Sequence, residues 1–253
     1  MNKELQTIIS RYTEQQLCLD NIVVSSFVKH NALTVQGGLL ADYCRDDVPI
    51  VDIESIEDVI NVFELAIPKA EKTKNGAIYT PKYIRDYILE RVATTQKKPL
   101  QDCLVIDIAC GCGAFLLSFA DYLHFHCGQS YRVAVNHLYG VDVSELSVKR
   151  CMILLSLTAL LNGETLTNED FHVSQGNSLN FDFTSIPEVV ENGGFDIVIG
   201  NPPYVRAKHI DEESKALLSH WQVARCGNVD LYLPFFEIAC DILCKDGVLG
   251  YIT

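Results

Sequence analysis

The sequence predicts an α/β fold built on a doubly wound, mostly parallel sheet, with a helical appendage at the N-terminus. Three observations lead to this prediction. From about residue 100 onward short apolar segments alternate with helical segments, glycines occupy the turn after the first apolar segment, and polar residues follow several of the others. Apolar strands that alternate with helices are typical of a parallel sheet covered by helices on both faces.

The N-terminal residues are predicted to be helical. Residues 1–30 have helical character, and apolar residues recur at helical spacing within 53–67. A polar loop then leads to a further helix, for which Thr80 is the expected N-cap and Pro81 the first residue.

The alternating part of the chain contains five predicted strands separated by helices. The strands are expected at 103–109, 138–143, 171–174, 195–200 and 247–252. The helices between them are expected at 114–125, 145–162 and 231–245, the last ended by Gly247. We therefore expect two parts, an N-terminal helical region at 1–75 and a sheet domain at 76–253. In such a sheet, ligands bind beyond the carboxyl ends of the strands, where the strand order reverses.

Composition predicts a folded protein of the cytoplasm. Apolar residues make up 48% of the 253 residues, which is enough for a well-filled core. The longest apolar run, residues 151–161, is shorter than the roughly 20 residues that a membrane span requires, so we expect a buried helix there. The first residues carry charges throughout and lack the apolar core of a secretory signal. No membrane contact is expected.

The ten cysteines are expected to be reduced, because several lie inside apolar strands and helices and no export signal precedes them. Two groups of residues have some likeness to metal ligands: Cys110 with Cys112, and His124 with His126 and Cys127. Neither group is accompanied by a second cluster with zinc-type spacing, so no metal is expected.

The end of the first strand has features of a ligand site. Asp107 lies inside the strand, and Gly111 and Gly113 lie in the turn into the next helix. Glycines there let the backbone approach a ligand and leave amide groups facing it; the alternative is a tight turn without a ligand. The dinucleotide pattern G-x-G-x-x-G is broken by Leu116, which disfavours a nicotinamide or flavin cofactor.

Two further strand ends favour a nucleoside ligand. Asp142 ends the second strand, where a carboxylate can accept two hydrogen bonds from a ribose diol, although an acid there could also start the next helix. Asn177 follows the third strand and could pair with the edge of an adenine ring, or could only shape its turn.

The fourth strand ends in IGNPPYV, residues 199–205, and this sequence suggests chemistry on a planar amine. The amide oxygen of Asn201 and the carbonyl of Pro202 can accept both N–H bonds of such an amine, which frees its lone pair. The double proline fixes the backbone that holds the carbonyl, and Tyr204 offers a flat face for a flipped base. The alternative is a rigid turn with a packed tyrosine.

Together, these motifs resemble the gamma-class adenine-N6 DNA methyltransferases of bacterial restriction-modification and related defence systems. The resemblance covers about Gly76 to Thr253. It rests on ordered motifs: GAIYTP (76–81), DIACGCGAF (107–115), VDVSE (141–145), GNSL (176–179), IGNPPYV (199–205), and NVDLYLPFFEIACDIL followed by DGVLGYIT.

The resemblance implies a Rossmann-like S-adenosylmethionine-dependent methyltransferase domain at 76–253, with double-stranded DNA carrying a flipped adenine as substrate. It implies cofactor contacts by the approach segment, the glycine loop and the strand ends, namely Tyr79, Thr80, Pro81, Asp107, Ala109, Cys110, Gly111, Gly113, Phe115, Asp142, Val143, Asn177, Ser178, Leu179 and Asn201. The implied catalytic residues are Asn201, Pro202, Pro203 and Tyr204.

The sequence departs from the family in two places. Asn177 stands where many relatives carry Asp, and the sheet is expected to be truncated after the fifth strand, whereas relatives continue with two more strands and a target-recognition domain. The formal charge of −13 agrees with the second departure, because a protein that grips DNA alone would be expected to carry a basic surplus. We therefore expect a missing C-terminal target-recognition domain or a partner subunit.

Several other functions use the same features. A release-factor glutamine methyltransferase also places NPPY on a planar carboxamide, but its expected pattern lacks the GAIYTP segment. Cytosine-N4 methylation would favour Ser in place of Asn201, while guanine or RNA adenine methylation remains open. The alternative outside enzymes is a non-catalytic, cofactor-binding subunit of a defence complex.

Overall fold

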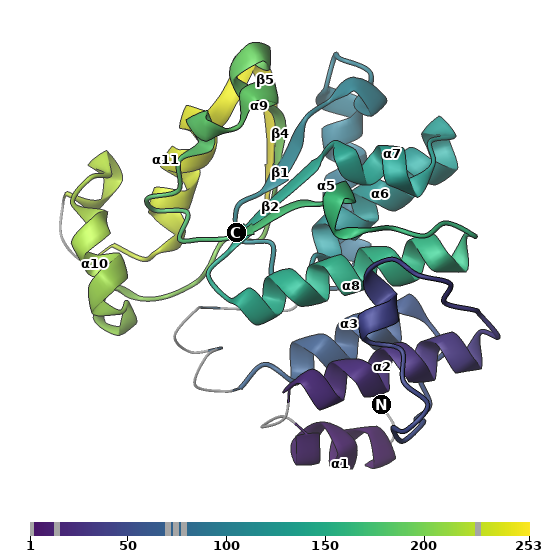
Figure 1. Cartoon of the computed structure of the whole chain (residues 1–253). Helices are drawn as coiled ribbons and strands as arrows, with labels where there is room; N and C mark the ends of the chain where they lie inside the picture. The colour runs from purple at the N-terminus through teal and green to yellow at the C-terminus, as the bar shows by residue number, and fades with distance from the viewer. Residues whose placement is uncertain (1–2, 13–15, 69–71, 73–75, 77–79, 226–228) are drawn as a thin grey trace.

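The computed structural model describes all residues except 1–2, 13–15, 69–71, 73–75, 77–79 and 226–228, and it confirms the predicted α/β class. One parallel sheet contains β1 (Val105–Asp107), β2 (Leu138–Asp142), β3 (His172–Gln175), β4 (Phe195–Gly200) and β5 (Leu243–Tyr251). Its strand order is β3-β2-β1-β4-β5, so the order reverses between β1 and β4 (Figure 1).

The α-helices of the described residues occur before and between these strands. They are α1 (Lys3–Tyr12), α2 (Gln16–His30), α3 (Ile56–Leu65), α5 (Lys82–Thr95), α6 (Ala114–Cys127), α7 (Tyr131–Asn136), α8 (Glu145–Leu161), α9 (Pro187–Asn192), α10 (Glu212–Leu218) and α11 (Tyr232–Ile242). Among them, none combines the length and apolar character that crossing a membrane requires.

Both faces of the sheet are buried. Successive residues of a strand point to opposite sides, so neighbouring residues report on the two faces. In β4, Ile197 belongs to a core shared with α5, α6 and α8, whereas Val198 belongs to a second core shared with α9 and α11. This two-sided burial explains why the strands are continuous apolar runs.

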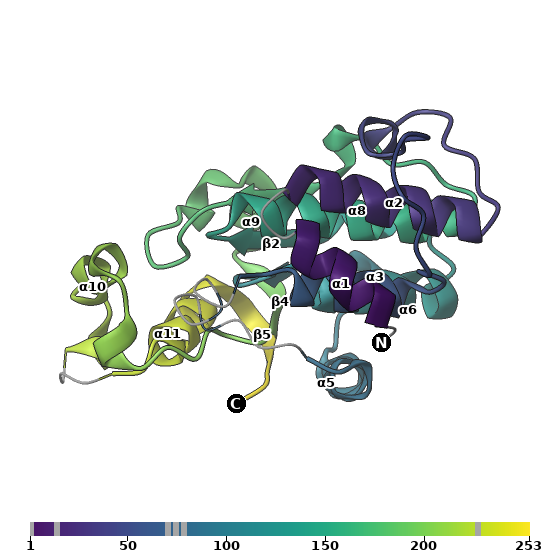
Figure 2. The same cartoon turned by 90° about the horizontal axis from the view of Figure 1, so that it is seen from below.

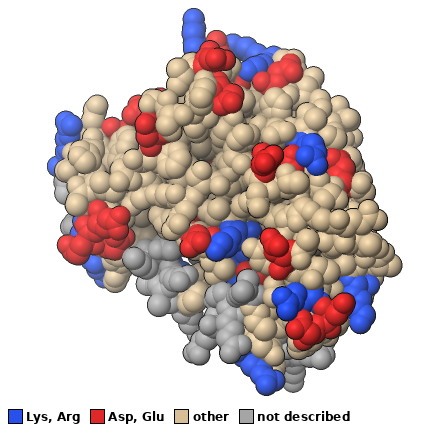
Figure 3. All heavy atoms as spheres, viewed as in Figure 1, with Lys and Arg blue, Asp and Glu red and all other residues tan. Residues whose placement is uncertain are grey.

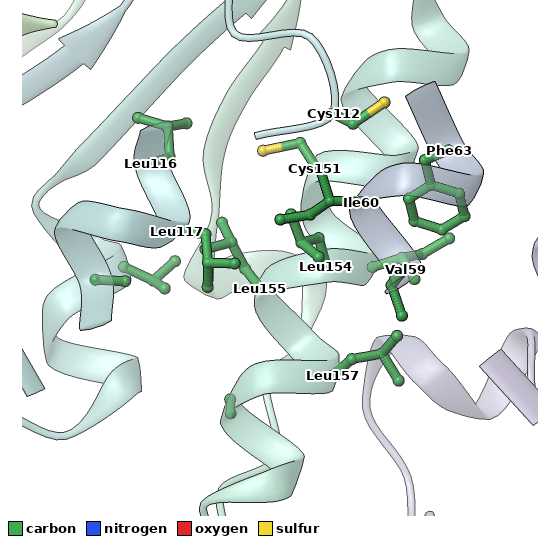
Figure 4. Close-up of a cluster of buried hydrophobic side chains, with 14 of the residues drawn as sticks. Val59, Ile60, Phe63, Cys112, Leu116, Leu117, Cys151, Leu154, Leu155 and Leu157 are labelled. Carbon is green, nitrogen blue, oxygen red and sulfur yellow. The ribbon is translucent and has the colours of Figure 1, made fainter. Parts of the chain in front are cut away.

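The N-terminal helices form an additional layer beyond α8. In Figure 1 they lie below α8, with the sheet above it, and α2 and α3 both contact α8. Figure 4 shows Ile60 and Phe63 of α3 beside Cys151 and Leu154 of α8. Because α8 is covered by the sheet and by helices, most of its residues are buried, which confirms the buried helix expected from the apolar run at 151–161.

A buried ion pair joins this N-terminal layer to α8. The Nε atom of Arg150 lies 2.9 Å from Oδ1 of Asp20, and both side chains are almost fully removed from water. The Arg150 guanidinium also donates to the carbonyl of Phe63 and lies 5.0 Å from the centre of its ring. Burial raises the pKa of Asp20 in spite of Arg150, so the desolvation of this carboxylate outweighs the attraction.

The structure corrects the prediction for the last helix and strand. Gly247 does not end α11: the helix stops at Ile242, and β5 begins at once with Leu243, which pairs with Phe195. The next pair is Ile197 with Val248. Between these two pairs β5 has more residues than β4, so the register of the two strands shifts there. Asp246 occupies the left-handed conformation within it. Edge strands accommodate such bulges easily, and the sequence pattern gives little sign of them.

No pattern in the sequence predicts the helices α7, α9 and α10. Each of these helices has only six or seven residues, which is too short for a helical period to be visible. In Figures 1 and 2, α10 projects from the end of the molecule opposite the N-terminal helices.

Replacing Arg150 with Ala should lower the free energy of unfolding by about 3–5 kcal/mol, because Asp20 would remain buried without its cation. The measurement is the urea unfolding curve. Lys149→Ala is the matched control. Lys149 pairs with Glu145 on the exposed side of the same helix, so its replacement should lower the free energy of unfolding by about 0.5 kcal/mol or less. Equal effects of the two variants would contradict this account.

Candidate active site

A cavity of about 650 Å³ lies at the carboxyl ends of the strands, where the strand order reverses. Its wall brings together most of the predicted cofactor residues and part of the predicted catalytic motif. These are Thr80, Asp107, Ala109, Cys110, Gly111, Phe115, Asp142, Val143, Asn177, Ser178, Leu179, Asn201 and Pro203. Pro81, Gly113, Pro202 and Tyr204 do not line it, and Tyr79 lies outside the described residues.

The two glycines of the first turn have different tasks. Gly111 has a φ of 52°, and a Cβ added to it would meet no atom within 4 Å, so this part of the backbone is open. Gly113 has a φ of 86°, and a Cβ there would lie 2.4 Å from the sulfur of Cys151. Gly113 therefore allows α6 to pack closely on α8, while Gly111 presents backbone to the cavity.

Asp142 is held rigidly at the end of β2. One carboxylate oxygen accepts the backbone N–H of Gly111 at 2.9 Å, and the other accepts that of Ser144, also at 2.9 Å. Burial raises the pKa of Asp142, and these two hydrogen bonds oppose the rise. Each carboxylate oxygen has a second lone pair, so the group can still accept hydrogen bonds from a ligand.

The turn after β3 is shaped by its own side chains. Oδ1 of Asn177 accepts the N–H of Leu179 at 3.1 Å, while the Asn177 amide nitrogen lies 3.4 Å from the hydroxyl of Ser214 on α10. The hydroxyl of Ser178 donates to the carbonyl of Ile108 at 2.6 Å. Asn177 thus has the turn-shaping role that the sequence left open, and it still faces the cavity.

Asn201 follows β4 directly, and its side-chain orientation is fixed. Its Nδ2 atom donates to the hydroxyl of Thr80 at 3.0 Å, which determines the direction of the acceptor atom Oδ1. Further along the chain, the hydroxyl of Tyr204 donates to the carbonyl of Ile252 at 2.7 Å, and its ring lies 5.8 Å from that of Tyr232.

The structure corrects the prediction that Thr80 caps the following helix. The N-cap of α5 is Pro81, without a side-chain hydrogen bond, and the Thr80 hydroxyl serves Asn201 instead. Arg85, which is 1% exposed, holds Thr80 in place by donating to its carbonyl at 2.7 Å. The same guanidinium donates to Glu57 of α3 at 2.5 Å and to Ser118 of α6 at 3.2 Å.

Asp107 lies at the reversal point, beside the end of β4. Burial raises the pKa of its carboxyl group to about 7, the N–H of Ala109 opposes this rise, and the nearby charge of Asp142 adds to it. A Cβ added to Gly200 would lie 2.5 Å from a carboxylate oxygen of Asp107, so only glycine allows β4 to pass this close. Asp107 is therefore a buried acid whose charge changes near neutral pH.

The charged side chains known to line the cavity wall are acidic. The wall contains the carboxyl groups of Glu64, Asp107, Asp142, Asp211 and Glu213, and no Lys, Arg or His among the described residues. Such a wall repels phosphate groups and attracts a cation. This selects against dinucleotide cofactors more directly than the broken glycine pattern does.

Sequence reasoning missed several lining residues. Glu64 and Ile67 come from the end of α3 and the segment after it, Asp211, Glu213 and Ser214 from the region of α10, and Phe235 from α11. The motifs predict residues next to strand ends, whereas these residues reach the cavity through tertiary packing. The only signal was the acidic character of the segment 211–213, DEE, in a stretch without a predicted element.

Asp107→Asn should change how stability depends on pH. The pKa of Asp107 is about 7 in the folded protein and lower in the unfolded chain. The contribution of Asp107 to the free energy of unfolding is therefore fully present below about pH 4 and is lost as the pH rises through 7. Asn cannot ionise, so the variant avoids this loss. As the pH rises from 5 to 8, its free energy of unfolding should increase relative to that of the wild type by on the order of 2 kcal/mol. The measurement is unfolding by urea at several pH values, with the exposed Asp241→Asn as control. Parallel curves for wild type and Asp107→Asn would rule out this assignment.

Comparison with known proteins identifies the relatives of this chain. Residues 136–253 match the family described as Eco57I restriction-modification methylase. The type II methyltransferase M.PaeR7I of Pseudomonas aeruginosa is 30% identical over 193 residues, which cover 70% of this chain and 31% of that protein. The restriction enzyme and methyltransferase RM.Eco57I of Escherichia coli is 27% identical, covering 73% of this chain and 24% of that protein. The adenine-specific methyltransferase PglX of Streptomyces coelicolor is 24% identical, with 74% and 20% covered.

Solved structures share the fold. The type ISP restriction-modification enzyme LlaBIII, solved bound to DNA, has a TM-score of 0.64 at 18% identity, covering 94% of this chain and 21% of that one. A class I S-adenosylmethionine-dependent methyltransferase of Listeria monocytogenes, described as putative, has a TM-score of 0.50 at 18% identity, with 94% and 72% covered. The chain spans about a third or less of the length of the sequence relatives given above. The resemblance indicated by the motifs is thus confirmed: residues 136–253 match the Eco57I restriction-modification methylase family, and the chain shares its fold with a structure described as a putative class I S-adenosylmethionine-dependent methyltransferase.

Proposed function

We propose that this chain binds S-adenosylmethionine and is the catalytic portion of a DNA adenine-N6 methyltransferase of a restriction-modification or related defence system. The family match and the named relatives support the proposal. The observation that carries it is the placement of Asn201: its amide faces the cavity at the reversal point, is oriented by Thr80, and is followed by two prolines.

The cavity suits this cofactor in charge. S-adenosylmethionine carries a sulfonium, an ammonium and one carboxylate, so its net charge is positive, and the described wall offers only carboxyl groups as charged side chains. We assign Asp142 to the ribose hydroxyls, the turn of Asn177, Ser178 and Leu179 to the adenine ring, and Thr80 with the open backbone at Gly111 to the methionine part. When bound, the cofactor would supply a methyl group activated by its sulfonium.

The residues of the chain would activate the acceptor amine without removing a proton first. Oδ1 of Asn201 and the carbonyl of Pro202 would each accept one N–H of the adenine amino group, so that the nitrogen lone pair turns toward the methyl carbon. The two acceptors would hold the nitrogen in line with the methyl group that the cofactor would supply, and the extra proton on nitrogen would leave to solvent. Positioning supplies most of the rate in a transfer of this kind.

We further propose that most DNA contacts come from a target-recognition domain or a partner subunit outside these 253 residues, and that the target adenine is flipped into the site. The short span relative to the sequence relatives given above supports this, and so does the charge of −13. On the face shown in Figure 3, Lys and Arg are scattered among Asp and Glu and form no continuous positive patch in the described part. A surface of this kind gains little from releasing counterions of DNA.

We also propose that the chain divides between residues 75 and 76 into an N-terminal helical region and the catalytic domain.

Asn201→Ala should reduce transfer of labelled methyl from S-adenosylmethionine to unmethylated DNA by about 100-fold or more, because one of two acceptors for the amine is lost. Asn168→Ala, at an exposed asparagine far from the motif, is the control and should leave transfer unchanged. Binding of S-adenosylhomocysteine, measured by calorimetry, should persist in both variants.

The same assay separates the alternatives. Label on adenine that survives Asn201→Ala would contradict the catalytic assignment, and label on a release factor would replace DNA as the substrate. Cofactor binding without transfer to either acceptor would mean that the chain requires a partner for catalysis.

A further inference from the structure

The carboxyl groups that face the cavity are not equivalent. Asp107 accepts the N–H of Ala109, Asp142 accepts two backbone N–H groups, and Asp211 accepts the N–H of Ser214 as the N-cap of α10. Glu213 is exposed and therefore solvated. Each of these four carboxyl groups has a hydrogen-bond donor or water. The fifth group, Glu64, differs from them.

Glu64 is a half-buried carboxyl group whose side chain makes no hydrogen bond and no ion pair with any described residue. It faces the cavity from the last turn of α3. Burial raises its pKa; the charge of Lys72 opposes this rise, and the charge of Asp142 adds to it. An acid in this position is costly for the apo protein unless a cation is supplied.

The two buried arginines near Glu64 are engaged elsewhere, and Lys72, whose charge opposes the rise in the pKa of Glu64, forms no ion pair with it among the described residues. The Arg85 guanidinium donates to Glu57, to the Thr80 carbonyl and to Ser118, and that of Arg150 pairs with Asp20. Neither forms an ion pair with Glu64. The cation that Glu64 lacks can therefore come from a ligand in the cavity.

The helix that carries Glu64 is firmly fixed. Ser55 and Asp58 form a capping box at its start, and Arg85 holds Glu57 in its first turn. Near its end, Phe63 packs against α8 and accepts a hydrogen bond from Arg150 (Figure 4). Glu64 follows Phe63 directly, so its backbone has little freedom to move away from the cavity.

The position of Glu64 indicates which part of the cofactor it meets. Glu64 lines the same cavity as Cys110 and Gly111 of the glycine turn between β1 and α6. Burial raises the pKa of Cys112 in this turn, and the charge of Glu64 adds to that rise. In doubly wound folds the nucleoside ribose is held at the end of β2, and whatever is attached to its 5′ carbon passes over that first turn. In S-adenosylmethionine this attachment is the methionine part with its ammonium group.

We propose that Glu64 binds the α-ammonium group of S-adenosylmethionine, so that the N-terminal helical region supplies part of the cofactor site. This inference rests on the proposed function. It assigns a role in ligand binding to a residue outside the methyltransferase motifs, and it explains why a carboxylate without a partner among the described residues persists at the end of α3.

Calorimetric binding of two neutral-sulfur ligands tests the proposal without requiring catalysis. S-adenosylhomocysteine has the ammonium group, whereas 5′-methylthioadenosine has the same nucleoside and thioether but no amino-acid part. Glu64→Gln should weaken binding of S-adenosylhomocysteine by about 10-fold to 100-fold, because a charge-assisted hydrogen bond is lost. It should leave binding of 5′-methylthioadenosine unchanged. Glu90→Gln, at an exposed glutamate of α5 that does not line the cavity, is the matched control and should affect neither ligand.

A second arm does not depend on the folding of the variant. Wild-type protein should bind an analogue of S-adenosylhomocysteine with hydrogen in place of the amino group about 10-fold to 100-fold more weakly than the parent compound. Equal losses for both ligands in Glu64→Gln, or no loss for either, would overturn the assignment of Glu64 while leaving the proposed function intact. Failure of the wild type to bind either nucleoside would overturn the proposed function and this inference with it.

Discussion

The buried guanidinium of Arg85 holds together the parts of the molecule that form the site. It joins Glu57 on α3, the carbonyl of Thr80 and Ser118 on α6, and the Thr80 hydroxyl in turn receives the amide of Asn201. Loss of one partner would leave polar groups of this largely buried network without a hydrogen bond, so the bonds support one another. The orientation of the Asn201 amide therefore depends on a network that reaches α3, a helix that precedes the methyltransferase motifs.

The second constraint is the concentration of acids around one cavity. Asp107 is buried and Asp142 is partly buried. Burial raises the pKa of both carboxyl groups, and the charge of Asp142 adds to the rise at Asp107. A protein without a ligand bears this desolvation cost, which a bound cation would offset. The same arrangement that makes the apo site unfavourable thus selects a positively charged cofactor over the phosphate-bearing ligands that other doubly wound folds bind at this position.

The sequence predicts the sheet and the strand-end residues well because both depend on local patterns. Asp142 and Asn201 directly end or follow buried strands, and the parallel fold brings such ends to one edge of the sheet. The sequence does not predict Arg85 or Glu64, because their importance comes from partners far away in the chain. The position of Thr80 before Pro81 predicts a helix cap, but the hydroxyl of Thr80 accepts a long-range hydrogen bond from Asn201 instead. Local preference gives way where tertiary contacts offer a better partner.

The central claim is that this cavity holds S-adenosylmethionine, and competitive binding tests it most directly. Radiolabelled S-adenosylmethionine would be equilibrated with the 253-residue chain in the presence of excess S-adenosylhomocysteine or excess ATP. The account predicts that S-adenosylhomocysteine displaces the label and that ATP, whose phosphates meet only carboxyl groups among the described charged side chains of the wall, does not. Displacement by ATP, or the absence of any bound label, would contradict it.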